Sequence, residues 1–233
     1  MPRNLYLYFT ATGSYWLPDS PSDHLIQSVI RGEVFDQPLV DAMRSVARPG
    51  DVYLDIGSNF GQTAVLMSKA VGRDGRVLAF EADPWIGGAL ERNLRQNGCQ
   101  NSSVFVSAVW DEPGQTLIYP TDDLETYESH GSYGIDPAAT TGQMVPSITI
   151  DSLGLDRVDL MKIDVQGADL RALKGARQTI SRCKPCIFFE YEQQFDSRFG
   201  TSWQDYLCFI DEIDYRIDDV ISCVNVLIRP RTQ

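Results

Sequence analysis

The sequence has no long hydrophobic run and no cluster of basic residues. Its apolar stretches fall short of the ~18 consecutive residues that a membrane helix needs. Residues 1–20 lack the basic start and apolar core of a secretory signal. Lys and Arg number 20 against 32 Asp and Glu, a formal net charge of -12, which repels nucleic acid and anionic lipid. We therefore expect a cytoplasmic protein with no membrane span and no nucleic-acid partner.

Cysteine and histidine are also scarce. The five cysteines are an odd number at long spacings, which argues against a disulfide framework. The pair Cys183-Lys-Pro-Cys186 has redox or zinc spacing, but no second pair follows, so we interpret both as core cysteines. Of the two histidines, His24 falls on an expected helix. His130 falls in a polar loop, where it is a candidate for proton transfer near pH 7 or an exposed loop residue.

The composition is that of an ordinary globular protein. Among 233 residues, 43% are hydrophobic and 22% are charged, which excludes a mainly disordered chain. We expect a single domain over residues 1–233. In this interpretation residues 1–50 are a lead-in that covers the site, with helices near residues 22–30 and 39–46. The core then runs from residue 51 to residue 233.

From residue 51 the sequence alternates short β-branched and aromatic runs with stretches of helical spacing. This pattern is typical of βαβ units around a mostly parallel sheet with helices on both faces, an α/β fold. The expected strands are residues 52–56, 77–80, 104–109, 159–165, 187–192, 216–221 and 224–228. The last two stand too close together for a helical crossover and should be antiparallel. Residues 111–146 break the alternation, and the polar loop 121–142 is long enough to suggest a function.

The turn after the first strand is the most informative stretch. It reads Asp55-Ile56-Gly57-Ser58-Asn59-Phe60-Gly61, at the edge where parallel sheets bind ligands against a helix N-terminus. A dinucleotide fingerprint has a glycine where this chain has Asn59. Asp55 would oppose a pyrophosphate but attract an ammonium or sulfonium group. The candidate contacts for a cofactor in this turn are Asp55, Gly57, Ser58, Asn59 and Gly61.

Glu81 adds a second signal. It ends the next expected strand, 24 residues after Gly57, where an acid accepts hydrogen bonds from a ribose diol. The two signals together describe an adenosine ligand with a cationic amino-acid arm and no phosphate, which is S-adenosylmethionine (SAM). The alternative is a plain crossover with a structural glycine turn. A nicotinamide oxidoreductase is disfavoured by Asp55 and Asn59.

Four blocks of the sequence resemble, in order, the FkbM-type SAM-dependent methyltransferases. The blocks are residues 55–61, Ala79-Phe80-Glu81-Ala82-Asp83-Pro84, residues 160–169 and residues 185–190. The resemblance implies a class I, Rossmann-like methyltransferase fold, whose seven-stranded sheet has one antiparallel strand. It also implies Ala82, Ser107 and Ala108 as cofactor contacts, the last two beside the adenine ring. The family usually has glutamate where this chain has Gln166 and Asp169, so the role of the first of these is open.

The reaction that the resemblance implies is O-methylation of a hydroxyl. The expected acceptor is a carbohydrate or a glycosylated small molecule, the alternatives being a polyketide or peptide metabolite, or a cofactor-binding protein without turnover. A hydroxyl loses its proton more easily to a nearby general base, and such a base typically raises the rate ~10²–10⁴-fold. Asp164 and Glu190 end the fourth and fifth expected strands at one crevice and are the first candidates for the base, with His130 as the third. Asp164 could instead order the cofactor, and a divalent metal between the two carboxylates stays open, as does the oligomeric state.

Overall fold

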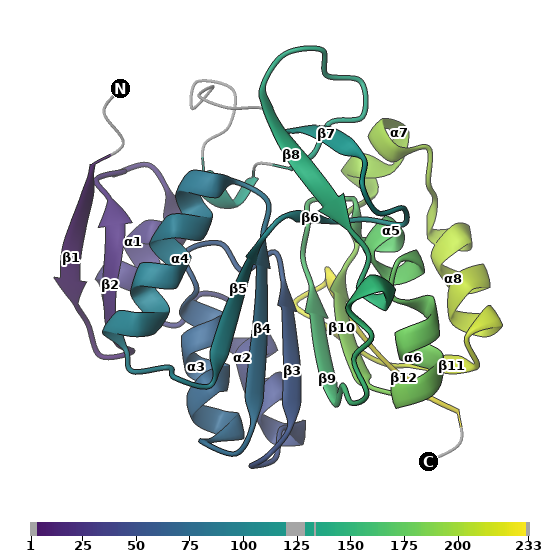
Figure 1. Ribbon diagram of the computed structural model, residues 1–233, viewed down its shortest axis with the longest axis horizontal. Helices are drawn as coiled ribbons and strands as arrows, with labels where there is room; N and C mark the ends of the chain where they lie inside the picture. Colours follow the sequence, from purple (N-terminus) through teal and green to yellow (C-terminus); the bar gives the residue numbers. More distant parts are fainter. Residues whose placement is uncertain (1–3, 120–128, 133, 232–233) are drawn as a thin grey trace.

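The computed structural model of the chain describes residues 4–119, 129–132 and 134–231. A seven-stranded sheet in the order β11-β12-β10-β9-β3-β4-β5 forms its centre (Figure 1). β12 is antiparallel to both of its neighbours, while the other pairings in this sheet are parallel. The expected α/β fold with one antiparallel strand is therefore confirmed. The strands are β3 (Val52–Ile56), β4 (Arg76–Glu81), β5 (Ser102–Val106), β9 (Leu160–Ile163), β10 (Cys186–Glu190), β11 (Tyr215–Ile221) and β12 (Asn225–Pro230).

Helices cover both faces of this sheet (Figure 1). Successive side chains of a strand point to opposite faces, so Tyr53 packs in the apolar cluster with α2, α3 and α4, whereas Leu54 and Ile56 pack in the cluster with α5, α6 and α8. Asp55 therefore points to the same side as Tyr53. The helices are α1 (His24–Ile30), α2 (Gln37–Val46), α3 (Gln62–Val71), α4 (Pro84–Gln96), α5 (Asp169–Lys174), α6 (Arg177–Cys183), α7 (Asp196–Phe199) and α8 (Trp203–Glu212). Short 3-10 turns occur at His130–Ser132, Asp151–Leu153 and Gln193–Phe195.

The expected strand 104–109 is two strands. β5 ends at Val106, and the N–H of Ser107 donates to the carbonyl of Glu81 at 3.0 Å. Beyond that point β6 (Ala108–Val109) leaves the large sheet and pairs with β8 (Gln143–Ile148), which also pairs with β7 (Thr116–Tyr119). β8 was not expected, because its polar residues and Pro146 hide the alternation typical of a strand. The small sheet lies above the upper ends of the central strands (Figure 1).

Residues 5–18 form a hairpin that the sequence analysis did not predict. β1 (Leu5–Phe9) and β2 (Ser14–Pro18) are antiparallel. The hairpin is fixed to α4 by two asparagines: Asn93 Oδ1 accepts from the N–H of Trp16 at 2.6 Å, and Asn97 Oδ1 accepts from the N–H of Ser14 at 2.9 Å. The lead-in is thereby attached to the core of the fold.

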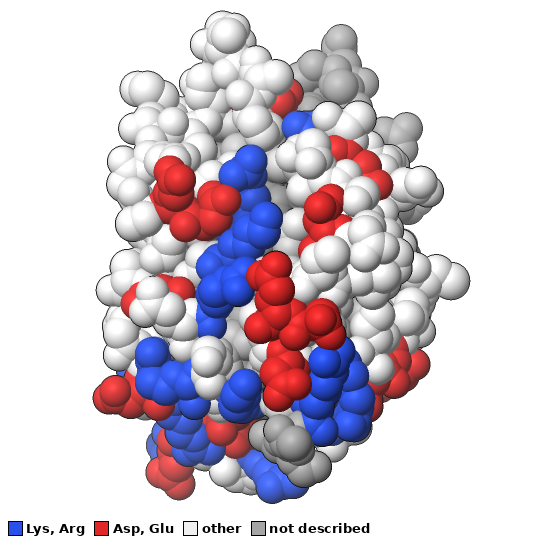
Figure 2. All heavy atoms as spheres, turned by 90° about the vertical axis from the view of Figure 1, so that its right-hand side faces the viewer, with Lys and Arg blue, Asp and Glu red and all other residues white. Residues whose placement is uncertain are grey.

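The face that holds α8 and β11 carries charges of both signs side by side (Figure 2). Several of its arginines pair with acids: Arg216 and Arg229 both contact Asp218, at 3.2 and 2.9 Å, and Arg231 contacts Asp211 at 2.7 Å. Exposed pairs of this kind contribute at most about 1 kcal/mol each. Within residues 4–119, 129–132 and 134–231, no helix has the length and apolar character to cross a bilayer.

Candidate functional site

A cavity of about 620 Å³ opens at the carboxyl ends of β3, β4, β9 and β10. It brings together residues from the lead-in, the glycine turn, the small sheet and the strand ends. Of the candidate site residues, those on the cavity wall are Gly57, Ser58, Asn59, Gly61, Glu81, Ala82, Ser107, Ala108, His130, Asp164 and Glu190. Asp55 is the candidate that does not reach the wall. The structure therefore contains the expected crevice, but Asp55, one of the acids expected to line it, is buried behind its wall.

The β3–α3 turn is held tightly against its neighbours. The N–H groups of Gly57 and Ser58 both donate to the carbonyl of Phe80, at 3.0 and 2.9 Å. Gly57 has φ +81, and a Cβ there would lie 1.8 Å from the carbonyl oxygen of Asp164. A side chain at this position would separate β3 from the segment after β9. The glycine is therefore needed to bring the two strand ends together.

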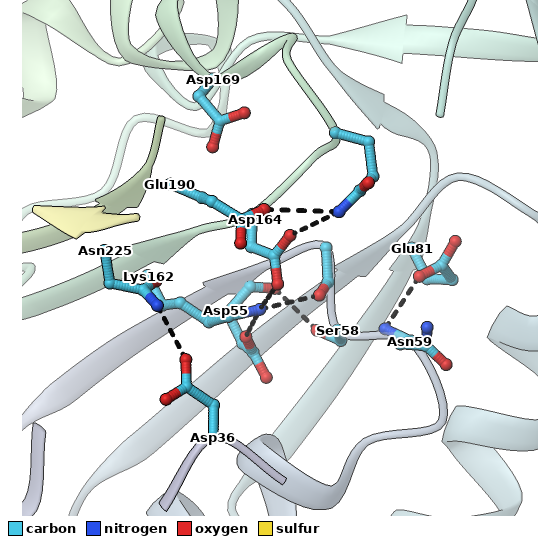
Figure 3. Close-up of polar contacts among 12 residues, drawn as sticks. Asp36, Asp55, Ser58, Asn59, Glu81, Lys162, Asp164, Asp169, Glu190 and Asn225 are labelled. Atoms are coloured by element: carbon cyan, nitrogen blue, oxygen red, sulfur yellow. Dashed lines mark hydrogen bonds and ion pairs between the residues drawn. The ribbon is translucent and has the colours of Figure 1, made fainter. Parts of the chain in front are cut away.

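Glu81 ends β4 with its carboxylate on the cavity wall (Figure 3). Oε2 accepts from the N–H of Asn59 and Oε1 from the N–H of Asp83, both at 2.9 Å. A carboxylate offers about four lone-pair sites, so each oxygen can accept a further bond. Burial raises the pKa of Glu81 to about 7, although the backbone hydrogen bonds oppose the shift. The position is that expected for an acid that binds a diol.

The raised pKa of Glu81 gives a testable pH dependence. The folded protein holds this proton more tightly than the unfolded chain, so the contribution to stability is complete below about pH 4.5 and is lost as the pH rises through about 7. Glu81→Gln should remove this component, so that the melting temperature of the variant falls less than that of the wild type between these values. Glu91→Gln, on the exposed face of α4, is the control. Parallel melting curves for Glu81→Gln and wild type would contradict the assignment.

Lys162 is a site residue that the sequence analysis missed. It lies opposite Asp55 in the register of β9 and β3, and its Nζ is 3.7 Å from Asp55 Oδ1 and 3.2 Å from Asp164 Oδ2. Nζ also donates to the carbonyl of Gly57 at 3.0 Å. Asp55 is fully buried, and its oxygens accept no hydrogen bond from the described residues. The structure therefore does not support the expected direct contact between Asp55 and the cofactor. The Asp55 carboxylate lies next to the ammonium of Lys162 and does not line the cavity.

Burial and the charge of Lys162 shift the pKa values of Asp55 and Asp164. Burial raises the pKa of Asp55 above its ordinary value, and the ammonium of Lys162 opposes the shift. Burial would also raise the pKa of Asp164, but Lys162 and hydrogen bonds hold it below its usual range. A lone Lys in the apolar segment 160–163 was the signal in the sequence that could have revealed the pair.

The surroundings of Glu190 favour its protonated form. The charge of Asp164, together with burial, raises the pKa of Glu190 to about 11. Gln166 lies between the two, with Nε2 at 3.2 Å from Asp164 Oδ1 and 3.4 Å from Glu190 Oε2. The nearby Asp169, whose pKa burial raises to about 8, does not line the cavity. The two predicted bases thus lie together as expected, and the charge of Asp164 raises the pKa of Glu190.

His130 is not an exposed loop residue. Its side chain is 11% exposed, and its Nδ1 is 3.0 Å from Oδ2 of the fully buried Asp23. The same oxygen accepts from the N–H of His130 at 2.7 Å, and Oδ1 accepts from Ser129 Oγ at 3.0 Å and from the N–H of Ile26 at 3.1 Å. Burial would raise the pKa of Asp23, but the hydrogen bonds, led by that with His130, hold it below its usual range. Asp23 is therefore an ionised partner for the ring.

Aromatic rings fix the other sides of the imidazole. The ring centroid of His130 lies 5.7 Å from that of Phe60 and 5.7 Å from that of Trp85. No local pattern in the sequence indicates Asp23 beyond its position before α1, because it is 107 residues from His130. Only the packing of the lead-in over the turn brings the two together.

Asp36 and Asn225 attach the lead-in to the far side of the cavity. Asp36 caps α2, and its Oδ2 accepts from Asn225 Nδ2 at 2.7 Å (Figure 3). Both residues line the cavity. Among the described residues, no group of three or more His, Cys, Asp or Glu side chains is arranged to hold a metal ion.

Comparison with known proteins agrees with the resemblance found in the sequence. A family model described as the methyltransferase FkbM domain matches residues 55–217. Methyltransferase sdnD of Sordaria araneosa is 25% identical over 175 residues, which cover 61% of this chain and 66% of that protein. The chain thus covers slightly less than two thirds of that relative.

Two solved structures show the same fold. A methyltransferase FkbM from Methylobacillus flagellatus has a TM-score of 0.51 at 19% identity, over 88% of this chain and 52% of that chain. A Streptococcus mutans protein in complex with SAH has a TM-score of 0.50 at 11% identity, over 84% of this chain and 99% of that chain. At these identities the structures support the class I methyltransferase fold and no finer property.

Proposed function

Because this chain belongs to the FkbM methyltransferase family, we propose that it transfers the methyl group of SAM to a hydroxyl on a carbohydrate or a glycosylated small molecule. The main support for SAM as the cofactor is the position of Glu81, which ends β4 on the cavity wall next to the glycine turn. Each of its oxygens accepts one backbone N–H and has room for one ribose hydroxyl. The geometry suits a nucleoside without a phosphate.

The remaining contacts with SAM are inferred from the charge of the site residues and from their positions on the cavity wall. The ammonium of the methionine arm would face Asp164, which is ionised and on the wall, while Asp55 holds Lys162 in place behind it. The adenine ring would lie beside Ser107 and Ala108. When bound, SAM supplies a methyl group on a good leaving group, so the protein has to orient the acceptor and remove its proton.

We assign the base to His130. The raised pKa of Glu190 favours its protonated form, which cannot take a second proton, and the charge of Asp164 is engaged by Lys162 at 3.2 Å. His130 lies on the cavity wall, with Nδ1 at the ionised Asp23. Asp23 fixes the orientation of the ring and would stabilise it after it gains a proton. With SAM bound, the imidazole would accept the proton of the acceptor hydroxyl while the methyl group passes from the sulfur to that oxygen.

Ligand-induced stabilisation tests the cofactor. SAM, or the demethylated product SAH, at 100 times its dissociation constant should stabilise the protein by about 2.7 kcal/mol, and NAD should not. Glu81→Ala should lose most of this stabilisation, while Glu91→Ala should keep it. A response to NAD alone would overturn the assignment of SAM. Products methylated from a panel of sugars and glycosides, identified by mass, then test the acceptor.

A further inference from the structure

The part of the cavity next to the small sheet has an apolar, aromatic wall. Trp110 and Tyr119, each 4% exposed, and Ile135, 5% exposed, line it together with Phe195. They belong to one apolar cluster, which also contains Phe199 of α7. None of these residues is needed for the cofactor contacts proposed above. This wall is therefore available to the body of the acceptor.

Among the residues that the structure describes, one cation on this side of the cavity, Arg198, has no ion pair. Of the described residues on the cavity wall, Arg198 and Lys162 are the Lys and Arg side chains. Lys162 is paired with Asp55 and Asp164. Arg198 Nη1 is buried and donates to no acceptor among the described residues, and its guanidinium carbon lies 5.3 Å from the ring centroid of Phe195. A buried donor without a partner is unfavourable, and more so when it is charged.

We propose that the methyl acceptor carries an anionic group, a carboxylate or a phosphate, that binds to Arg198 while the body of the acceptor packs on the aromatic wall. A guanidinium presents paired donors that match both anions. Its contact with Phe195 holds it at the wall. Two acids, Glu190 and Glu192, line the same cavity; burial raises the pKa of each, with the charge of Asp164 the leading cause for Glu190, and this weakens their repulsion of an anion. This inference rests on the proposed function, because it assigns the charge of the acceptor in the same cavity.

Binding to the SAH-loaded protein tests the inference without turnover. Each of three pairs of probes contains one member with an anionic group and one neutral relative: glucuronate and glucose, glucose 6-phosphate and glucose, and 4-hydroxybenzoate and its methyl ester. By calorimetry, the charged member of at least one pair should bind roughly tenfold or more tightly than the neutral one. The pair that shows the preference identifies carboxylate or phosphate as the group recognised.

Variants connect the preference to Arg198. Arg198→Met should make the charged and neutral members bind equally, and Arg198→Lys should keep part of the difference. Arg95→Met, on the exposed surface of α4, removes the same charge away from the cavity and should change nothing. Equal affinities in the wild type, or a preference that survives in Arg198→Met, would overturn the anionic acceptor. Failure of the wild type to bind SAH would instead contradict the proposed function.

Discussion

Replacing Lys162 by methionine should lower the free energy of unfolding by about 3–5 kcal/mol, because it leaves the buried charge of Asp55 and the partly buried charge of Asp164 without their counter-ion. For a chain of this length, such a loss lowers the melting temperature by about 6–20 °C. The ammonium lies 3.7 Å from Asp55, whose side chain has no exposed surface. Calorimetric melting of the apoprotein measures the effect.

The pH dependence of this loss tests its cause. Without the lysine, the pKa of Asp55 should rise further, so the folded protein binds a proton that the unfolded chain releases. Stability then falls as the pH rises, and the deficit should be larger at pH 8 than at pH 5. Adding Asp55→Asn to the variant should recover part of the stability, whereas Lys174→Met, at the exposed end of α5, should behave like the wild type. A melting temperature within 2 °C of wild type for Lys162→Met would rule out the pairing.

Replacing His130 by glutamine should lower kcat by about 10²–10⁴-fold, the usual contribution of a general base. The affinity for SAM should change little, since the cofactor contacts come from the glycine turn, Glu81 and Asp164. The rate is followed as SAH release with the best acceptor of the panel, and SAM binding is followed by calorimetry. A loss of SAM binding in parallel with kcat would make His130 a cofactor or structural residue.

Asp23→Asn tests the role of Asp23 in orienting the ring. A neutral amide stabilises a protonated ring less well, and its nitrogen cannot accept the backbone N–H that one of the two carboxylate oxygens accepts in the wild type. We expect kcat to fall roughly tenfold or more and the melting temperature to fall as well, so kcat is compared at a temperature at which the variant is folded. Unchanged kcat in this variant would remove the role of Asp23.

Much of the sheet could be predicted because its signals are local. Buried parallel strands appear as short apolar runs, and the glycine turn with Glu81 follows the strand ends along the chain. The segments whose structure was predicted wrongly, or not predicted, lack such a local signal. β8 mixes polar residues with Pro146, and the expected strand at 104–109 divides where Ser107 bonds Glu81.

The sequence alone determined the family, the parallel core and the residues at the strand ends, because each depends on neighbours within a few positions. Only the tertiary structure decided how those residues are paired. Asp55 faces Lys162 because of the register between two strands distant in sequence, and His130 faces Asp23 because the lead-in folds over the turn. The raised pKa of Glu190 follows from a carboxylate contributed by another strand. Burial and the proximity of charges are properties of the packed chain, so the candidate base could be chosen only after packing was known.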